Sequence, residues 1–322
     1  MKVFPLYIRL VRPVNLFIIL FTVYVIRFAY ILPLQNFKYA SFSVDEVTYA
    51  LFALSFILVA AAGYIINDYY DVELDAINKP DKVIIGKTIS PERALRLYVI
   101  LNVIALCTGF YSCCAAGYPS FSLLFVFYAV SLWIYSYKLK STFLAGNVLV
   151  AICLALVPLS AIYLQSDVDE IADNIDAVHY FAWGLAVFAF LINLIREIVK
   201  DMQDAEGDAA LGCKTIPIVL GNRKTKIVVQ LLVALIIFLL GIFQYFIRVA
   251  EKNTLVIIYC AIFIQLPCLV VLWKTYKASS AGNYKKISGW LKFIMITGIS
   301  ICFVFAFEVW IILHIFSFYS PV

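Results

Sequence analysis

The sequence predicts an all-α fold, a polytopic membrane bundle of nine transmembrane helices around a central cavity, forming a single domain over residues 1–322. Hydrophobic residues make up 64% of the chain and charged residues 14%, and the mean hydropathy is +0.97. Soluble domains are nearer half apolar and a quarter charged. The apolar residues also form long runs, and about 20 mostly apolar residues suffice for a helix to cross a bilayer. We therefore expect an integral membrane protein.

Charge and turn signals separate the first five predicted helices. A basic arm precedes the first apolar run, but no small-residue cleavage site follows that run, so we expect a retained helix rather than a signal peptide. An acidic motif ends the second run. Gly117-Tyr-Pro119 separates the third run from the fourth, and Lys138-Leu-Lys140 separates the fourth from the fifth. These five runs cover 14–34, 47–66, 94–114, 119–137 and 142–164.

The other four helices follow from similar signals. The stretch 165–177, which holds five acidic residues, separates the fifth run from the sixth, and a second acidic motif ends the sixth. The last four runs cover 178–199, 225–247, 253–273 and 290–316. Of the 25 lysines and arginines, 21 lie on the N-terminal arm or in the loops after the second, fourth, sixth and eighth runs. The positive-inside rule therefore places the N-terminus and these loops in the cytoplasm, and we expect the plasma (inner) membrane.

Two acidic motifs share the spacing D-x-x-D-x-x-x-D, each at the cytoplasmic end of an apolar run. The two sets are Asp68, Asp71 and Asp75, and Asp201, Asp204 and Asp208. Offsets of three and seven residues place all three carboxylates on one face of a helix, where like charges repel unless a cation binds. Mg²⁺ prefers oxygen ligands and usually bridges one or two carboxylates to substrate phosphates. The motifs therefore predict a site for Mg²⁺ and a polyphosphate.

The motifs lie four predicted spans apart, which indicates an internal duplication with both copies in the same orientation. Parallel repeats place equivalent motifs opposite each other, so we expect both acid faces at the cytoplasmic mouth of the central cavity. Fixed cations would stabilise the charge of a leaving diphosphate. The candidate cations are Lys140, Arg196, Lys200 and Lys214. Tyr135 is one of several tyrosines near the mouth whose rings are candidates to stabilise an allylic cation.

Several other classes of protein fit the sequence less well. No basic run with interleaved aromatic residues is present, so we expect no nucleic-acid partner. The eight cysteines form no C-x-x-C, and His179 and His314 are far apart, which disfavours a haem or histidine-based site. A transporter would carry more intramembrane charge. A membrane scaffold would not need two intact acid triplets. Nothing in the sequence indicates an obligate protein partner.

The chain resembles the UbiA superfamily of intramembrane prenyltransferases over nearly its whole length. Asn67-Asp-Tyr-Tyr-Asp71, with Asp75 and the trailing Asn78-Lys-Pro80, is similar to the family's N-D-x-x-D-x-x-x-D signature followed by N-x-P. The second acidic motif is similar to the family's second aspartate motif. Tyr135-Ser-Tyr-Lys-Leu-Lys140 with Gly146-Asn147 resembles the family's loop after the fourth span, and Arg12-Pro-Val-Asn15 resembles its R-P-x-N. The resemblance implies two Mg²⁺ ions, a prenyl diphosphate donor and a central cavity.

The resemblance also implies roles for individual residues. Asn67 joins the first aspartate set as a metal ligand, and the second set holds the other Mg²⁺. Lys140 and Arg196 would bind the diphosphate, and Asn15 would lie in the pocket near the acceptor or metal. The residues predicted to be catalytic are Asp68, Asp71, Asp201 and Asp204. Those predicted to bind substrate are Asn15, Asn67, Tyr135, Lys140, Arg196 and Lys200.

The second motif indicates the acceptor. The R-E-I-x-K-D form at Arg196–Asp201 resembles the family branch that transfers a geranylgeranyl group to geranylgeranylglyceryl phosphate. Arg196 and Lys200 would then supply cations for the acceptor's phosphate. The expected partners are a prenyl diphosphate donor, a hydrophobic or phosphorylated lipid acceptor, and membrane lipid. Members that prenylate aromatic acceptors in quinone biosynthesis remain an alternative.

Overall fold

The computed structural model describes residues 4–37, 44–78, 83–165, 175–250 and 253–319. The described residues are helical apart from short connections and one isolated bridge between Ile85 and Ile89. Lys79 and Pro80 of the predicted N-x-P, and residues 166–174 of the acidic stretch, lie outside the described residues. The all-α prediction is confirmed.

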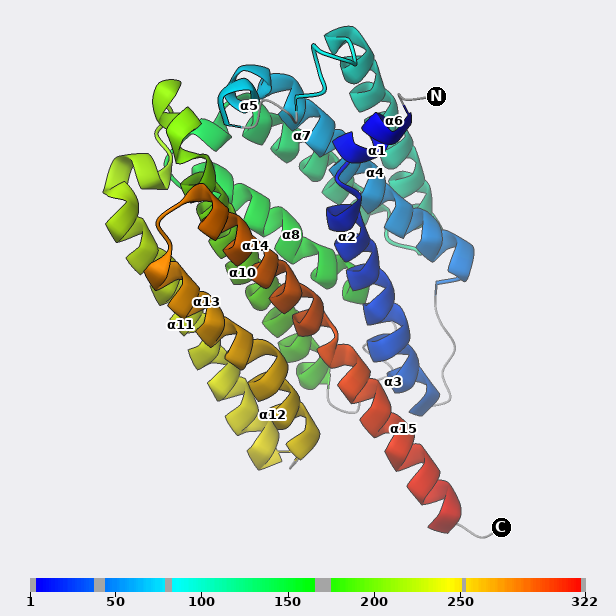
Figure 1. The fold of residues 1–322 in the computed structure, drawn as a ribbon. Coiled ribbons are helices and arrows are strands. Elements are labelled where there is room, and N and C mark those ends of the chain that lie inside the picture. The colour runs from blue at the N-terminus through cyan, green and yellow to red at the C-terminus, as the bar shows by residue number, and fades with distance from the viewer. Residues whose placement is uncertain (1–3, 38–43, 79–82, 166–174, 251–252, 320–322) are drawn as a thin grey trace. The chain divides into compact units, whose positions relative to one another are not determined.

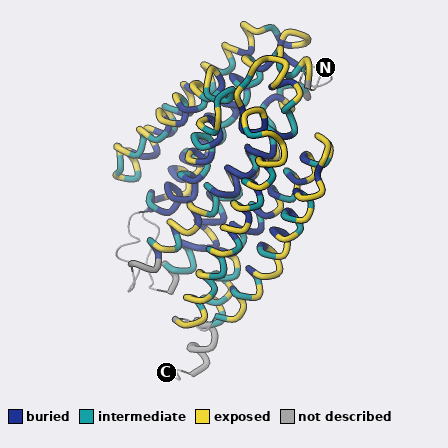
Figure 2. Tube along the Cα trace, turned by 90° about the vertical axis from the view of Figure 1, so that its left-hand side faces the viewer, coloured by how far each residue is buried: buried dark blue, intermediate teal, exposed yellow. Residues whose placement is uncertain are grey.

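Nine helical segments among the described residues are long and apolar enough to cross a membrane, as predicted. Their bounds are Pro13–Leu34, Glu46–Tyr70, Pro91–Ala115, Pro119–Tyr137, Ala145–Tyr163, Val178–Ala210, Ile216–Val249, Thr254–Lys277 and Ala281–Ile311. Large hydrophobic side chains are exposed along them, including Phe238, Leu231 and Phe246. Figure 2 shows buried and exposed positions alternating along single helices. A bilayer covers such exposed apolar positions, so the pattern fits a membrane protein.

Contacts divide the chain into two compact units, and the prediction of a single domain over 1–322 stays a prediction. The first unit comprises Met1–Phe21, Val44–Leu154 and Lys200–Thr225. The second comprises Thr22–Ser43, Ala155–Val199 and Lys226–Val322. Four helices run from one unit into the other: α2 (Pro13–Ile26), α8 (Ala145–Tyr163), α10 (Ile175–Ala210) and α11 (Ile216–Ala250).

In the first unit, α4 packs against both α6 and α7 (Figure 1). Besides parts of the shared helices, its helical elements are α1 (Phe4–Leu10), α4 (Glu46–Tyr70), α5 (Val72–Asn78), α6 (Pro91–Ala115), η3 (Pro119–Ser122), α7 (Leu123–Tyr137) and η4 (Leu139–Ser141). A Cβ at Gly109 would lie 2.3 Å from the Phe125 ring, so only glycine permits this approach of α6 to α7. The Tyr128 hydroxyl donates to the Cys153 carbonyl at 2.8 Å and links α7 to α8.

Capping side chains fix where two of these helices begin. Asp45 precedes α4, and its carboxylate accepts the backbone N–H groups of Val47 at 2.9 Å and Thr48 at 3.1 Å. Ser90 caps α6 and is followed by Pro91, whose missing N–H costs nothing in the first helical turn. The start of α4, the helix whose C-terminal end carries the first acidic motif, is therefore fixed by its cap.

The second unit is built from helices of the C-terminal half together with the end of the first span. Besides parts of the shared helices, its elements are η1 (Arg27–Ile31), α3 (Leu32–Phe37), α12 (Thr254–Cys260), η5 (Ala261–Gln265), α13 (Leu266–Lys277), α14 (Ala281–Ile299) and α15 (Ile301–Tyr319). Asn253 caps α12 and also donates to the Glu308 carboxylate, which joins α12 to α15. Glu308 thus acts as a helix–helix hydrogen-bonding partner.

Two predicted spans differ in detail from the structure. The predicted run 290–316 is two helices, α14 and α15, which meet at Ser300, and α14 already begins at Ala281. The first residues of α14 are polar, so the pattern of apolar runs did not predict that the helix begins there. The helix α11 extends back to Ile216, but Gly221 has φ 77° and ψ 158°, so a kink separates its first turns from the span. The predicted central cavity stays a prediction.

Candidate functional site

The first acidic motif lies across the junction of α4 and α5. Helix α4 ends at Tyr70, Asp71 follows it with φ −93° and ψ 6°, and α5 begins at Val72. The first motif therefore does not lie on a single continuous helix, and whether its three carboxylates share one face stays a prediction. The Asp71 side chain accepts a hydrogen bond from Asn67 Nδ2 at 2.6 Å. Such local side-chain bonds of aspartate and asparagine favour helix ends over helix interiors.

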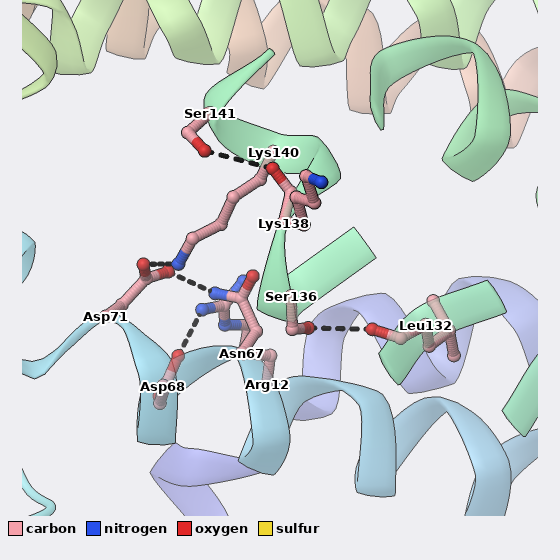
Figure 3. Close-up of polar contacts among 9 residues, drawn as sticks. All are labelled: Arg12, Asn67, Asp68, Asp71, Leu132, Ser136, Lys138, Lys140 and Ser141. Carbon is pink, nitrogen blue, oxygen red and sulfur yellow. Dashed lines mark hydrogen bonds and ion pairs between the residues drawn. The ribbon is translucent and has the colours of Figure 1, made fainter. Parts of the chain in front are cut away.

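Each of the first two aspartates is paired with a cation from elsewhere in the chain (Figure 3). The Arg12 guanidinium lies 2.5 Å from Asp68 Oδ1 and 4.8 Å above the centre of the Tyr64 ring. The Lys140 ammonium on η4 pairs with Asp71 Oδ1. Asp71 is 7% exposed, so its charge is largely removed from water and needs a partner.

The second motif lies on one continuous helix, α10, as predicted. Asp201 Oδ2 accepts from Asn147 Nδ2 at 2.8 Å. Asp208, which is 5% exposed, accepts from the Thr215 hydroxyl at 3.0 Å. Asp204 Oδ1 accepts from Gln203 Nε2 at 3.4 Å. Amide and hydroxyl donors therefore contact all three carboxylates of this motif.

Both motifs belong to the first unit, and the loop after α7 joins them. Lys140 in η4 reaches Asp71 of the first motif. Ser141, the next residue, accepts the backbone N–H of Lys214 at 2.8 Å, just after the second motif. The structure thus brings both aspartate sets and Lys140 into one region of the first unit.

Burial and neighbouring charge shift the pKa values of three groups in this region. Burial lowers the pKa of Lys140 to about 8, although Cys213, Asp68 and Asp208 act in the opposite direction. Burial tends to lower the pKa of Arg12, but the interactions with Asp68, Tyr64 and Asp75 together outweigh it, and the net shift is upward. Burial raises the pKa of the Cys213 thiol, as does Asp208. Both basic groups therefore lie where negative charge favours their protonated forms.

The remaining predicted substrate-binding residues lie in different surroundings. Asn15 on α2 and Tyr135 on α7 are half-buried in the first unit, and so is Lys200 on α10. Arg196, one helical turn before Lys200, belongs to the second unit, where its guanidinium donates to Glu197 at 3.1 Å. Whether these four residues bind substrate stays a prediction.

Sequence reasoning assigned no role to three residues that contact the motifs. Arg12 belongs to the R-P-x-N and Asn147 to the Gly146-Asn147 pair, so both were visible as parts of a pattern, whereas Thr215 follows Lys214 after the second motif. Their hydrogen bonds to the aspartates join residues that are 7 to 56 positions apart in the chain. The spacing of residues within a motif does not reveal such partners.

The donor chemistry of this region fits a hard divalent cation. The described residues hold no group of three or more histidine, cysteine or acidic side chains arranged to hold a metal by themselves. Mg²⁺ does not require one, because it keeps several waters and binds through one or two carboxylates together with substrate phosphates. Asp71 and Asp208 are buried oxygen donors, and each already has a positive or hydrogen-bond-donating partner.

Comparisons with known proteins place this region in a family. The model of the UbiA prenyltransferase family matches residues 37–296. A digeranylgeranylglyceryl phosphate synthase of Methanobrevibacter smithii is 30% identical over 299 residues, which cover 92% of this chain and 95% of that protein. Both matched regions include the two acidic motifs.

Solved structures show the same fold. A structure of digeranylgeranylglyceryl phosphate synthase has a TM-score of 0.63 at 23% identity and covers 96% of this chain and 100% of its own. A UbiA homologue of Archaeoglobus fulgidus, solved with DMAPP and Mg²⁺, has a TM-score of 0.57 at 20% identity and covers 91% of this chain and 99% of its own. The family match over most of the sequence, together with the relative of 30% identity, establishes that this chain belongs to the UbiA prenyltransferase family.

Proposed function

We propose that this protein transfers a geranylgeranyl group from geranylgeranyl diphosphate to geranylgeranylglyceryl phosphate, with Mg²⁺ as cofactor. The observation that carries the proposal is that two aspartate motifs and a half-buried lysine lie in one unit of a membrane-embedded member of the family. The acceptor follows from the relative in Methanobrevibacter smithii, which carries that synthase name and matches over 95% of its length.

The proposed metal ligands are the residues of the two motifs. Asn67, Asp68, Asp71 and Asp75 would hold one Mg²⁺ against the diphosphate, and Asp201, Asp204 and Asp208 would hold the second. Mg²⁺ held by these residues would neutralise negative charge on the leaving diphosphate. The UbiA homologue solved with DMAPP and Mg²⁺ supports this choice of metal.

The chain's own cations would act on the same leaving group. The bond between the allylic carbon and the diphosphate oxygen breaks, and its electron pair leaves with the diphosphate. Lys140 and Arg12 already lie against Asp71 and Asp68, so donor oxygens placed there meet fixed positive charge. The acceptor hydroxyl oxygen then forms the new carbon–oxygen bond and releases its proton. Water must be excluded, because it would otherwise capture the allylic carbon.

The acceptor side of the site is assigned to half-buried polar residues. Arg196 and Lys200, one turn apart on α10, are proposed to bind the phosphate of the acceptor. Tyr135 is proposed to face the allylic carbon, and Asn15 to lie near the acceptor or metal. We further propose that the N-terminus and this mouth face the cytoplasm of the plasma (inner) membrane, because most lysines and arginines lie on that side.

A transfer assay tests the proposed reaction. Purified protein with Mg²⁺ and geranylgeranyl diphosphate is given geranylgeranylglyceryl phosphate together with 4-hydroxybenzoate, dihydroxynaphthoate and homogentisate, and products are identified by mass spectrometry. We expect a diether phosphate and no prenylated ring. A prenylated ring would move the protein to aromatic acceptors. In a separate experiment, uptake of substrate into proteoliposomes without chemical change would indicate a transporter.

Replacing Arg196 by alanine is expected to impair use of the acceptor much more than use of the donor. Arg196 is proposed to contribute a charge-assisted bond to the acceptor phosphate, and loss of such a bond corresponds to roughly tenfold to a hundredfold in acceptor KM. The measurement is KM for each substrate, with Arg223→Ala, an exposed arginine of α11, as the matched control. An equal loss for donor and acceptor would contradict the assignment.

A further inference from the structure

The loop that carries Lys140 continues into α8 and reaches the second motif as well. Within residues 139–147, Lys140 pairs with Asp71, Ser141 accepts the N–H of Lys214, and Asn147 donates to Asp201 at 2.8 Å. Asp71 and Asp201 are 130 residues apart in the chain. This segment of nine residues therefore makes a direct contact with each of the two motifs.

Asn147 is built into this place rather than lying on the surface. The residue is 6% exposed, and its amide reaches across from α8 to α10. A carboxylate that accepts a fixed amide N–H is held in one orientation. Asn102 is also buried, but its side-chain amide donates to the Tyr98 carbonyl within its own helix. A bond from one helix to another, as Asn147 makes, is therefore not simply a consequence of burying an asparagine.

One residue of the 139–147 segment has an unfavourable backbone conformation. Leu144 has φ 61°, in the left-handed region that side chains disfavour. Among the described residues, the other non-glycine residue with positive φ is Arg12, the partner of Asp68. Sparsely populated backbone conformations persist where surrounding contacts over-determine them, and they gather at functional sites.

Gly146 allows the start of α8 to pack closely against the backbone of η4. A Cβ at this position would lie 2.7 Å from the Leu139 carbonyl oxygen and 3.1 Å from Lys140 Cα, both backbone atoms that cannot rotate away. Only glycine therefore lets the start of α8 lie directly against η4. The placement of Lys140 and the placement of Asn147 depend on one another through this contact.

We propose that Asn147 is a positioning residue for Asp201, and that the 139–147 segment couples the two motifs of the diphosphate site. Asn147 touches neither substrate nor metal in this proposal. It holds Asp201 in the orientation needed to bind a divalent cation, while Lys140, fixed by the same segment, stays on the first motif. The inference rests on the proposed function, because it presumes that both motifs hold metal and diphosphate.

The test measures metal binding directly, besides activity. Mn²⁺ binding to the full-length protein is followed by EPR in the presence of inorganic diphosphate, for wild type, Asn147→Leu and the matched control Asn102→Leu. Leucine keeps the approximate shape of asparagine and removes the donor. We expect Asn147→Leu to weaken the binding of one of two Mn²⁺ ions by about tenfold to a hundredfold and Asn102→Leu to leave both unchanged.

Two further variants separate positioning from a general loss of structure. In a double-mutant cycle, Asn147→Leu is expected to add little to Asp201→Asn, because the carboxylate that Asn147 orients has then already been removed. Gly146→Ala is expected to raise the donor KM through Lys140, whereas Gly241→Ala, where the added Cβ meets nothing within 4 Å, should not.

The possible results are distinguishable. Wild-type Mn²⁺ affinity in Asn147→Leu would overturn the positioning role and leave the proposed reaction standing. Additive effects in the double-mutant cycle would also overturn it. Absence of Mn²⁺ binding to the wild-type protein with diphosphate would overturn the proposed function, and the positioning role with it.

Discussion

Asp71→Asn is expected to lower the rate of prenyl transfer by roughly two to three orders of magnitude while the protein still folds. Asp71 lies at the junction of α4 and α5 and is almost completely buried. Its carboxylate is proposed to bridge the chain to Mg²⁺ and the diphosphate. Asparagine preserves the shape but removes the charge that binds the metal. The measurement is kcat with saturating donor over a range of Mg²⁺ concentrations.

A neighbouring acid provides the matched control for Asp71. Glu73 lies two residues further on, in the first turn of α5, and is exposed. Glu73→Gln removes the same charge from the same segment without touching the site, so its activity should be that of wild type. Asp204→Asn, in the second motif, should fail as Asp71→Asn does. Full activity in either motif variant would contradict the metal role of that motif.

The pattern of apolar runs was sufficient to predict the membrane fold. All nine predicted spans have a counterpart among the described helices, because a helix in a bilayer must be apolar over about 20 residues. Helix ends that lie outside the bilayer need not be apolar, so hydropathy does not predict them. Helix α14 begins at Ala281 with a polar first half, and the break at Asp71 depends on side-chain contacts rather than on hydropathy.

The candidate site was predictable only where its residues repeat a pattern. The aspartates recur at fixed spacing, and the loop carrying Lys140 follows a recognisable motif. The partners of Asp68, Asp71 and Asp201 were not predictable, because Arg12, Lys140 and Asn147 reach them through tertiary contacts. The helix geometry of 3.6 residues per turn says which residues of one helix share a face, but not which residues of another segment oppose them.

Lys140→Met is expected to be nearly as damaging as the loss of Asp71, for two separate reasons. Methionine keeps the length of the side chain but removes the positive charge proposed to bind the diphosphate, so the donor KM should rise and kcat should fall, together by roughly a hundredfold or more. The substitution also leaves Asp71 buried without its cation. Lys138→Met, at an exposed lysine two residues earlier, is the matched control and should have neither effect.

Stability and activity separate these two roles of Lys140. Removing one partner of a buried ion pair costs about 3–5 kcal/mol, so Lys140→Met should lower the free energy of unfolding by up to that amount, and so should Asp71→Asn, which leaves Lys140 without its carboxylate. The double variant Lys140→Met/Asp71→Asn removes both charges and should recover most of the lost stability. It should not recover activity, because neither the metal ligand nor the cation is restored. Recovery of activity in the double variant would mean that the pair only maintains structure. Unchanged stability in both single variants would mean that the contact between Lys140 and Asp71 does not persist in the membrane.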